Sequence, residues 1–214
     1  MAKNAMIFGD SSSTFRGYLQ EGYAVYYSED EHPELDVHHV SQTWWAQLAK
    51  EADLRLVLND SWSGSTIGYT GWEKADCSQT SSFIRRLRLL IERGFFAENE
   101  IHKVFVFGGT NDSWSNAPLG EPQYEAWEEE DLYNVLPAIA CFLHLLKETL
   151  PHAELYCLIN TGLKAEITAC MKEACARYGI TPVTFDSIDK YNGGHPTAQG
   201  MTDIKEAVIK ALHN

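Results

Sequence analysis

Residues 104–107 read Val-Phe-Val-Phe and are followed at once by a pair of glycines, Gly108 and Gly109. Four consecutive β-branched and aromatic residues are typical of a strand that is buried on both faces, as in the centre of a parallel sheet. Such a strand needs helices on both sides of the sheet to cover it. The stretch therefore predicts a layered α/β fold in which the two glycines end a central strand.

The rest of the chain alternates between short β-rich runs and amphipathic stretches, which is the pattern of a parallel sheet covered by helices. We expect strands at residues 5–8, 54–59, 103–107, 154–158 and 180–185. We expect helices at residues 43–52, 81–93, 125–150 (kinked or divided at Pro137), 163–178 and 197–212. Because Pro182 lacks a backbone donor, the last strand is placed at an edge of the sheet.

The composition narrows the class of protein. The 214 residues are 44% hydrophobic and 22% charged, which is ordinary for a globular chain, and the length predicts a single domain over residues 1–214. The net charge is −13 and no dense basic stripe is present, so neither nucleic acid nor an anionic membrane surface is an expected partner. Arg85, Arg86 and Arg88 alternate with apolar residues in a helical pattern, and we interpret them as a solvated helix face.

Nothing in the sequence predicts a membrane span, a disulfide or a metal. The longest uncharged apolar run, residues 135–143, is too short to cross a bilayer, and the N-terminus leaves no room for a signal peptide. We expect a soluble, cytoplasmic protein, although a secreted protein whose leader has been removed would have the same sequence. The five cysteines contain no CxxC pair and are interpreted as reduced thiols. His38 and His39 have no further ligands at metal spacing, so no metal or other cofactor is expected.

The first predicted strand runs into Gly9-Asp10 and then into three serines, beginning with Ser11. A serine at the tip of a strand, before a helix, exposes its hydroxyl and turns its own N–H toward the group that the hydroxyl attacks. Ser11 is therefore a candidate nucleophile. The alternative reading is that these serines only cap the next helix.

Three further strand ends carry polar residues that would open onto the same crevice, because ligands bind outside the carboxyl ends of parallel strands. The second strand runs into a loop with Gly64, whose bare N–H can approach a ligand. The third strand runs into Asn111, whose carboxamide is a donor, and the fifth is followed by His195 directly before Pro196. Each segment alone is common in turns, but their joint occurrence indicates a catalytic site.

In this order, the segments resemble the motif blocks of SGNH (GDSL-like) hydrolases from residue 7 to about 201. The matching residues are Gly9-Asp10-Ser11, Asn59 to Gly64 with Ser65-Thr66, Gly109-Thr110-Asn111-Asp112, and His195-Pro196. The resemblance implies a flavodoxin-like, three-layer α/β/α sandwich with a five-stranded, mostly parallel sheet, which hydrolyses carboxylic esters. It also implies that Ser11 is the nucleophile and His195 the base, with an oxyanion hole made by the N–H groups of Ser11 and Gly64 and the side chain of Asn111.

One position departs from the family pattern. The family places an aspartate three residues before the histidine to orient the imidazole, and this chain has Asn192 there. Asp189 or Asp186 can take the role if the glycine-rich loop follows an unusual path, and this is the alternative we favour. A Ser–His dyad, with a backbone carbonyl holding Nδ1, is the second alternative, and the third is a binding protein that has lost catalysis.

The substrate is indicated only by aromatic residues. Trp62 and Trp114 flank the second and third blocks, where their rings can stack on sugars or simply pack loops onto the sheet. The leading prediction is a serine esterase that removes short acyl groups, including O-acetyl groups of carbohydrates, so the expected partner is a small-molecule or saccharide ester. The alternatives are a non-catalytic carbohydrate binder and a flavodoxin-like module that binds phosphate or FMN at residues 9–14.

The polar residues 27–40 are interpreted as a solvated loop, with a lid as the alternative.

Overall fold

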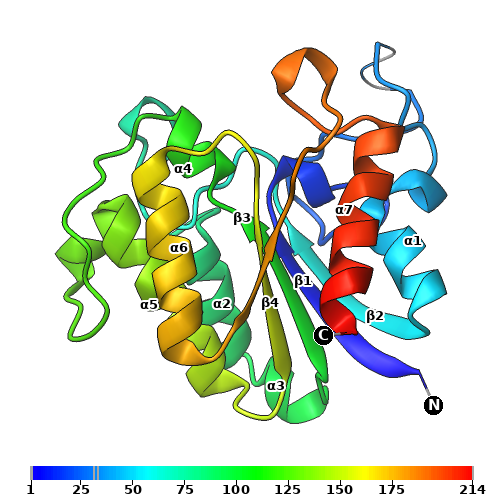
Figure 1. Cartoon of the computed structure of the whole chain (residues 1–214). Helices are drawn as coiled ribbons and strands as arrows, with labels where there is room; N and C mark the ends of the chain where they lie inside the picture. Colours follow the sequence, from blue (N-terminus) through cyan, green and yellow to red (C-terminus); the bar gives the residue numbers. More distant parts are fainter. Residues whose placement is uncertain (1, 31, 33, 214) are drawn as a thin grey trace.

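A computed structural model describes residues 2–30, 32 and 34–213 of the chain. In this part, one sheet of parallel strands has the order β2-β1-β3-β4-β5 (Figure 1). The strands are β1 (Lys3–Gly9), β2 (Leu54–Ser61), β3 (Lys103–Gly108), β4 (Glu154–Ile159) and β5 (Thr181–Thr184). The predicted α/β class is confirmed, and the sheet is parallel throughout rather than mostly parallel.

The order of the strands follows from their side chains. All six residues of β3 are buried, as expected of a strand covered on both faces, and β3 lies in the middle of the sheet between β1 and β4. β5 contains Pro182, pairs only with β4 and forms an edge, where a missing backbone donor costs no ladder bond. Both positions agree with the sequence-based predictions.

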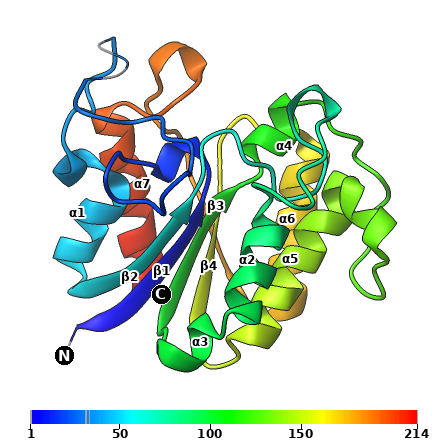
Figure 2. The ribbon, with the colours of Figure 1, turned by 180° about the vertical axis from the view of Figure 1, so that it is seen from behind.

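Helices cover the two faces of the sheet (Figures 1 and 2). One face packs on α2 (Phe83–Glu92), α5 (Val135–Thr149) and α6 (Ala165–Tyr178), and the other packs on α1 (Trp44–Glu51) and α7 (Ala198–Leu212). Side chains of β3 alternate between the two cores, since Val104 and Val106 enter the first and Phe105 the second. The result is the expected three-layer α/β/α sandwich.

Two short helices stand outside the predicted set: α3 (Phe95–Glu98) and α4 (Thr110–Trp114), which begins directly after β3. The predicted helix at 125–150 is divided, but not at Pro137. A 3-10 turn, η4 (Glu129–Tyr133), precedes α5, and the break lies at Asn134. Pro137 lies in the first turn of α5, where no intrahelical N–H bond is lost and its fixed φ suits the helix.

The interpretation of the arginines as a solvated helix face is wrong for Arg86. Its side chain is 1% exposed and forms an ion pair with Asp60, which is 0% exposed. Arg85 and Arg88 keep partly exposed side chains and pair with Glu92 and Glu129. The helical pattern was correct, but one cation faces the core rather than the solvent.

Cys141, Cys157, Cys170 and Cys175 are buried and Cys77 is partly buried, all five with free thiols, as expected. Among the described residues, each helix is too short or too polar to span a bilayer. The described residues likewise contain no group of three or more potential metal ligands.

Candidate active site

Ser11 lies in a buried turn at the carboxyl end of β1. It opens the 3-10 helix η1 (Ser11–Ser13), and Asp10 caps this helix by accepting a hydrogen bond from the backbone N–H of Ser12 at 3.0 Å. At the other end, the hydroxyl of Thr14 donates to the carbonyl of Ser11 at 2.9 Å. The backbone on both sides of the candidate nucleophile is therefore fixed by directional hydrogen bonds.

The same turn is tied to the neighbouring elements through Ser13. Its carbonyl accepts from the indole of Trp45 and from the amide of Asn59, each at 2.9 Å, and its hydroxyl accepts from the indole of Trp44 at 3.1 Å. Gly9 makes this packing possible, since a Cβ there would come within 2.6 Å of the Cβ of Ser13. A glycine is required for this close approach of strand and turn.

Beneath the turn, the buried guanidinium of Arg86 connects the ends of two strands with a loop. Nη1 pairs with Oδ2 of Asp60 at 2.7 Å, while Nη2 donates to the carbonyl of Gly9 at 3.2 Å and to the hydroxyl of Ser65 at 3.3 Å. Asp60 also accepts from the side chain of Gln20 at 2.6 Å. One ion pair thus links the ends of β1 and β2 to the loop that contains Gly64.

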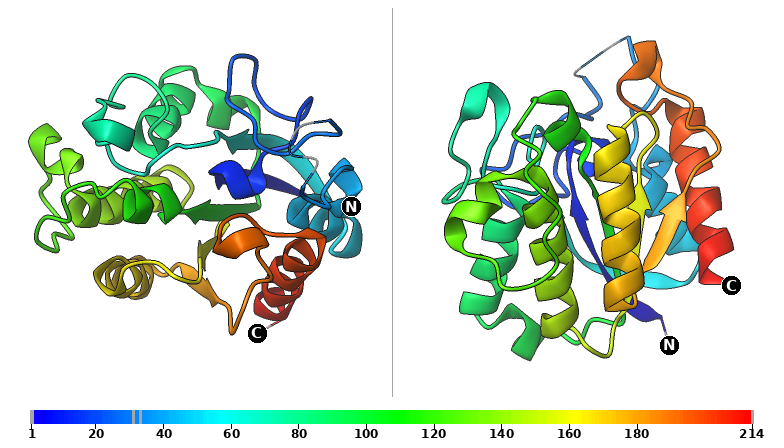
Figure 3. Two further views of the ribbon diagram at one scale, coloured as in Figure 1. Left: turned by 90° about the horizontal axis from the view of Figure 1, so that it is seen from above. Right: turned by 60° about the vertical axis from the view of Figure 1, so that its left-hand side comes forward.

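His195 reaches the nucleophile from the loop before α7. Its Nε2 lies 2.8 Å from Oγ of Ser11, across 184 positions of sequence. Viewed from the carboxyl edge of the sheet, η1 and the loop before α7 lie side by side (Figure 3). Burial, together with the positive charges of His32 and Lys190, lowers the pKa of His195 to about 4. The imidazole is therefore neutral at neutral pH and can accept the Ser11 proton.

Neither favoured aspartate is brought to the imidazole. The carboxylate of Asp189 accepts a hydrogen bond from the hydroxyl of Thr197, the N-cap of α7, and Asp186 is exposed beside α7. Asn192 is exposed in a turn with φ of 48°. Among the described residues, no carboxylate or carbonyl hydrogen-bonds to the ring of His195.

The two other donors from the sequence follow the carboxyl ends of β2 and β3, with Gly64 in the loop after β2 and Asn111 in α4. Gly64 has φ of 80°, a left-handed conformation that favours glycine, and no described residue accepts from its N–H. The side-chain amide of Asn111 donates to the carbonyl of Ser65 at 2.9 Å, which links α4 to the Gly64 loop. The orientation of this amide is fixed from its other end, because the indole of Trp72 donates to Oδ1 of Asn111 at 3.2 Å.

The aromatic residues divide into packed and exposed rings. Trp62 packs on Tyr23 in a tilted arrangement with ring centroids 4.3 Å apart, whereas Trp114 is 37% exposed and lies edge-on to His195 at 6.2 Å. Trp72, which is 45% exposed, was not singled out from the sequence because nothing in its loop pattern relates it to Asn111. Two exposed indoles, Trp72 and Trp114, therefore border the Ser11 site.

Besides Asp60, two carboxyl groups are buried near the site, those of Asp10 and Asp112. Burial raises the pKa of Asp10 and of Asp112 to about 6. Asp112 accepts from the backbone N–H groups of Ile67 at 3.0 Å and Gly68 at 3.3 Å, and so holds the loop after Gly64. Within the described part of the chain, Oδ2 of Asp10 has no hydrogen-bond partner. Both carboxyl groups accept hydrogen bonds from backbone N–H groups and so hold the loops around the site in place.

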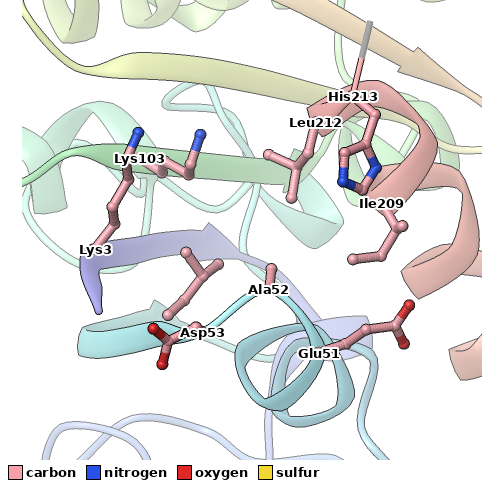
Figure 4. A pocket seen from close by; sticks show the side chains of 9 residues that line it. Lys3, Glu51, Ala52, Asp53, Lys103, Ile209, Leu212 and His213 are labelled. Atoms are coloured by element: carbon pink, nitrogen blue, oxygen red, sulfur yellow. The ribbon is translucent and has the colours of Figure 1, made fainter. Parts of the chain in front are cut away.

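A pocket of about 300 Å³ lies at the opposite, amino edge of the sheet (Figure 4). Lys3, Lys103 and Asp53 line it, together with the end of α7. Lys103 is neutralised by Glu154 at 2.5 Å. In open parallel sheets, ligand chemistry gathers at the carboxyl edge, and the serine and histidine lie there.

A serine hydroxyl that contacts a histidine at the end of the first strand of a three-layer sandwich is an arrangement that hydrolases with a serine nucleophile use. Comparisons with known proteins specify the class. The family model described as GDSL-like lipase/acylhydrolase matches residues 3–212. The chain belongs to this family and is a carboxylic ester hydrolase.

Solved structures agree with this assignment. A protein from Bacteroides ovatus described as a GDSL-like lipase is 39% identical, with a TM-score of 0.91, and the match covers 100% of this chain and 99% of that one. One from Bacteroides uniformis with the same description is 40% identical, with a TM-score of 0.90, covering 99% and 96%. An acetyl xylan esterase from Butyrivibrio proteoclasticus shares the fold at 18% identity and a TM-score of 0.62, covering 99% and 63%. No curated protein matched the sequence.

Proposed function

We propose that the protein hydrolyses short-chain acyl esters, O-acetyl groups on carbohydrates among them, with Ser11 as nucleophile and His195 as base. The observation that carries the proposal is the 2.8 Å contact between Oγ of Ser11 and Nε2 of His195. This distance is within the range for proton transfer between a nucleophile and its base.

In the proposed reaction, Oγ of Ser11 attacks the acyl carbon while its proton passes to Nε2 of His195. The negative charge on the former carbonyl oxygen is met by the N–H groups of Ser11 and Gly64 and by the Asn111 amide. His195 then donates the proton to the alcohol oxygen as the C–O bond breaks. Water, deprotonated by His195, attacks the acyl-serine in the second half and releases the carboxylic acid and free Ser11.

We assign the base to a Ser–His dyad rather than a triad. Asp189 accepts a hydrogen bond from Thr197 and Asp186 is exposed, and among the described residues no hydrogen bond joins either carboxylate to Nδ1. The low pKa of His195, set mainly by burial, is consistent with a ring that has no anionic partner. The imidazolium formed during attack then needs stabilisation from other groups.

A small acyl group and a saccharide alcohol suit the surroundings of Ser11. The serine is only 7% exposed, and the exposed rings near it are the indoles of Trp72 and Trp114, which offer flat faces for sugar rings. Carbohydrate esterases are among the proteins with this fold, including a family two carbohydrate esterase from Cellvibrio japonicus at 16% identity. These features support a saccharide ester over a long-chain lipid.

Active-site labelling tests the proposal. A fluorophosphonate probe is expected to modify the protein once, at Ser11 as located by peptide mass spectrometry, and the labelling rate is expected to fall at least 100-fold in His195→Ala. Ser187→Ala, which removes an exposed serine beside Asp186, is the matched control and should label like the wild type. A folded protein that is not labelled, or is labelled elsewhere, contradicts the assignment and favours a non-catalytic binder.

A further inference from the structure

We propose that Tyr26 is a positioning residue that stacks on the imidazole of His195 and supplies, together with Tyr27, the orientation that a carboxylate supplies in a triad. The inference rests on the proposed esterase function. It comes from the segment between η1 and α1, in which residues 27–40 were interpreted as a solvated loop, with a lid as the alternative, and no role was predicted for Tyr26.

The contact of Tyr26 with His195 is face to face. The ring centroids are 3.5 Å apart and the planes differ by 15°. The opposite face of Tyr26 carries the ring of His32, at 4.3 Å and 23°. A flat ring held against the imidazole prevents it from tilting out of the plane that contains Nε2 and Oγ of Ser11.

Tyr27 fixes the backbone beside the same histidine. Its ring is 1% exposed and meets the imidazole edge-on at 6.4 Å, and its hydroxyl donates to the carbonyl of Pro196 at 2.7 Å. The carbonyl of His195 itself accepts from the N–H of Tyr191 at 3.0 Å. The backbone on the two sides of the ring is therefore anchored without a carboxylate.

The aromatic clamp, defined as Tyr26 and Tyr27, is also tied to the nucleophile turn. The N–H of Tyr26 donates to the hydroxyl of Thr14 at 2.9 Å, and that hydroxyl donates to the carbonyl of Ser11 at 2.9 Å. The carbonyl of Tyr27 accepts from the N–H of Arg16 at 3.0 Å. The segment leaves the turn after Ser11 and returns to it, so the spacing of clamp and nucleophile is fixed by short connections.

The stack of Tyr26 on His195 also stabilises the positive charge that the imidazole carries during the reaction. When His195 takes the proton of Ser11 it becomes an imidazolium, and the face of an aromatic ring attracts a cation at this distance. The side chains that act electrostatically on His195 are the bases His32 and Lys190, and neither can supply a negative charge to balance the imidazolium. Tyr26 therefore favours the charged form of His195 that exists only during the reaction.

The test compares three variants on a short-chain aryl ester. Tyr26→Leu, which keeps apolar volume but removes the ring, is expected to lower kcat about tenfold to 100-fold with KM changed less than about threefold. Tyr26→Phe keeps the ring and is expected to retain most of the wild-type kcat. Tyr18→Leu is the matched control, since Tyr18 lies in the same segment, is 52% exposed and packs on Trp45 rather than on His195.

A second measurement reports on the stack without catalysis. The Hε1 proton of His195, assigned by its loss in His195→Ala, is expected to be shifted upfield by the Tyr26 ring, to keep this shift in Tyr26→Phe and to lose it in Tyr26→Leu. An ordinary chemical shift in the wild type, or a Tyr26→Leu enzyme with unchanged kcat, overturns the proposal. A wild type that hydrolyses no ester overturns the esterase function itself, which is a different result from the loss of activity in Tyr26→Leu alone.

Discussion

The proposed nucleophile, Ser11, and the proposed base, His195, are held in place by different kinds of contact. Ser11 belongs to a turn fixed by directional hydrogen bonds from β1, β2, α1 and α2, down to the buried pair of Arg86 and Asp60. His195 is held by aromatic faces and by bonds to the backbone around it. Hydrogen bonds fix an atom in direction and distance, whereas a stacked ring fixes a plane and permits sliding within it.

The difference matches the two tasks. The oxyanion donors must stay still to meet a charge that appears only in the transition state. The imidazole must face Oγ of Ser11 during attack and the leaving-group oxygen afterwards, so a support that fixes its plane but not its position suits it. The predictions below separate the two kinds of support.

The largest effect is expected from removing the base. His195→Ala should lower kcat for a short-chain aryl ester by about 10³–10⁴, because Ser11 then has no group to accept its proton. KM should change little, since the ring is used in the transition state rather than in substrate binding. Steady-state kinetics on folded protein provide the measurement, and a loss smaller than tenfold would remove His195 from this role.

Removing one proposed oxyanion donor is expected to lower kcat less than removing His195. Asn111→Ala should lower kcat by about 10²–10³, the usual loss for one oxyanion donor. Trp72→Phe keeps an aromatic ring but cannot donate to Oδ1 of Asn111, so we expect a smaller fall, about threefold to tenfold. Equal kinetics for wild type and Asn111→Ala would show that the amide serves only its bond to Ser65.

The polar network under the nucleophile can be broken directly. Arg86→Leu leaves Asp60 buried without its cation and should lower the free energy of unfolding by about 3–5 kcal/mol. Arg85→Leu, on the same helix but with a partly exposed side chain, should change it by less than about 1 kcal/mol. Urea unfolding of the two variants measures the difference, and similar values for both would contradict the central role of the Arg86 pair.

The fall of kcat/KM in acid, which reports the protonation of His195, is expected at lower pH than for an ordinary histidine. Protonated His195 cannot accept the Ser11 proton, and burial lowers its pKa from 6.5 to about 4. We therefore expect kcat/KM to be nearly constant down to about pH 5. With a histidine of ordinary pKa, the enzyme would already have lost about nine-tenths of its activity at pH 5.5. Asp10→Asn is the control, because Asp10 has a pKa of about 6 and titrates in the same range. An acid limb near 6.5 in both proteins would contradict the lowered pKa of His195.

The fold could be predicted from the sequence because its signals are local. Val104 to Phe107 are apolar on both faces, and the helices carry clear amphipathic patterns, so strand and helix positions followed to within a few residues. The exception is the helix predicted at 125–150, which begins only at Val135. The burial of Arg86 was not predicted, although its position in the sequence indicates it. It stands three residues after Phe83 and four before Leu90, on the buried stripe of α2, where an arginine needs a buried anion.

The site was only partly predictable. The contact between Ser11 and His195 could be expected because strand ends of a parallel sheet meet at one edge. The roles of Gly64 and Asn111 rest on the same argument and stay predictions. The contacts of Tyr26 and Trp72 depend on the path of irregular loops, which have no periodicity from which a path can be deduced. The same loops decide that Asp189 bonds to Thr197 rather than to the imidazole, and no count of residues before His195 contains that information.

The most direct test of the dyad compares two variants in one assay. The double variant Asp186→Asn/Asp189→Asn and the single variant Ser11→Ala are measured for kcat on the same short-chain aryl ester. Because neither aspartate contacts His195, the double variant is expected to stay within about threefold of wild type, while Ser11→Ala loses at least about 10³. A double variant that falls by about 10⁴, as when a triad aspartate becomes asparagine, would contradict an esterase that works through Ser11 and His195 alone.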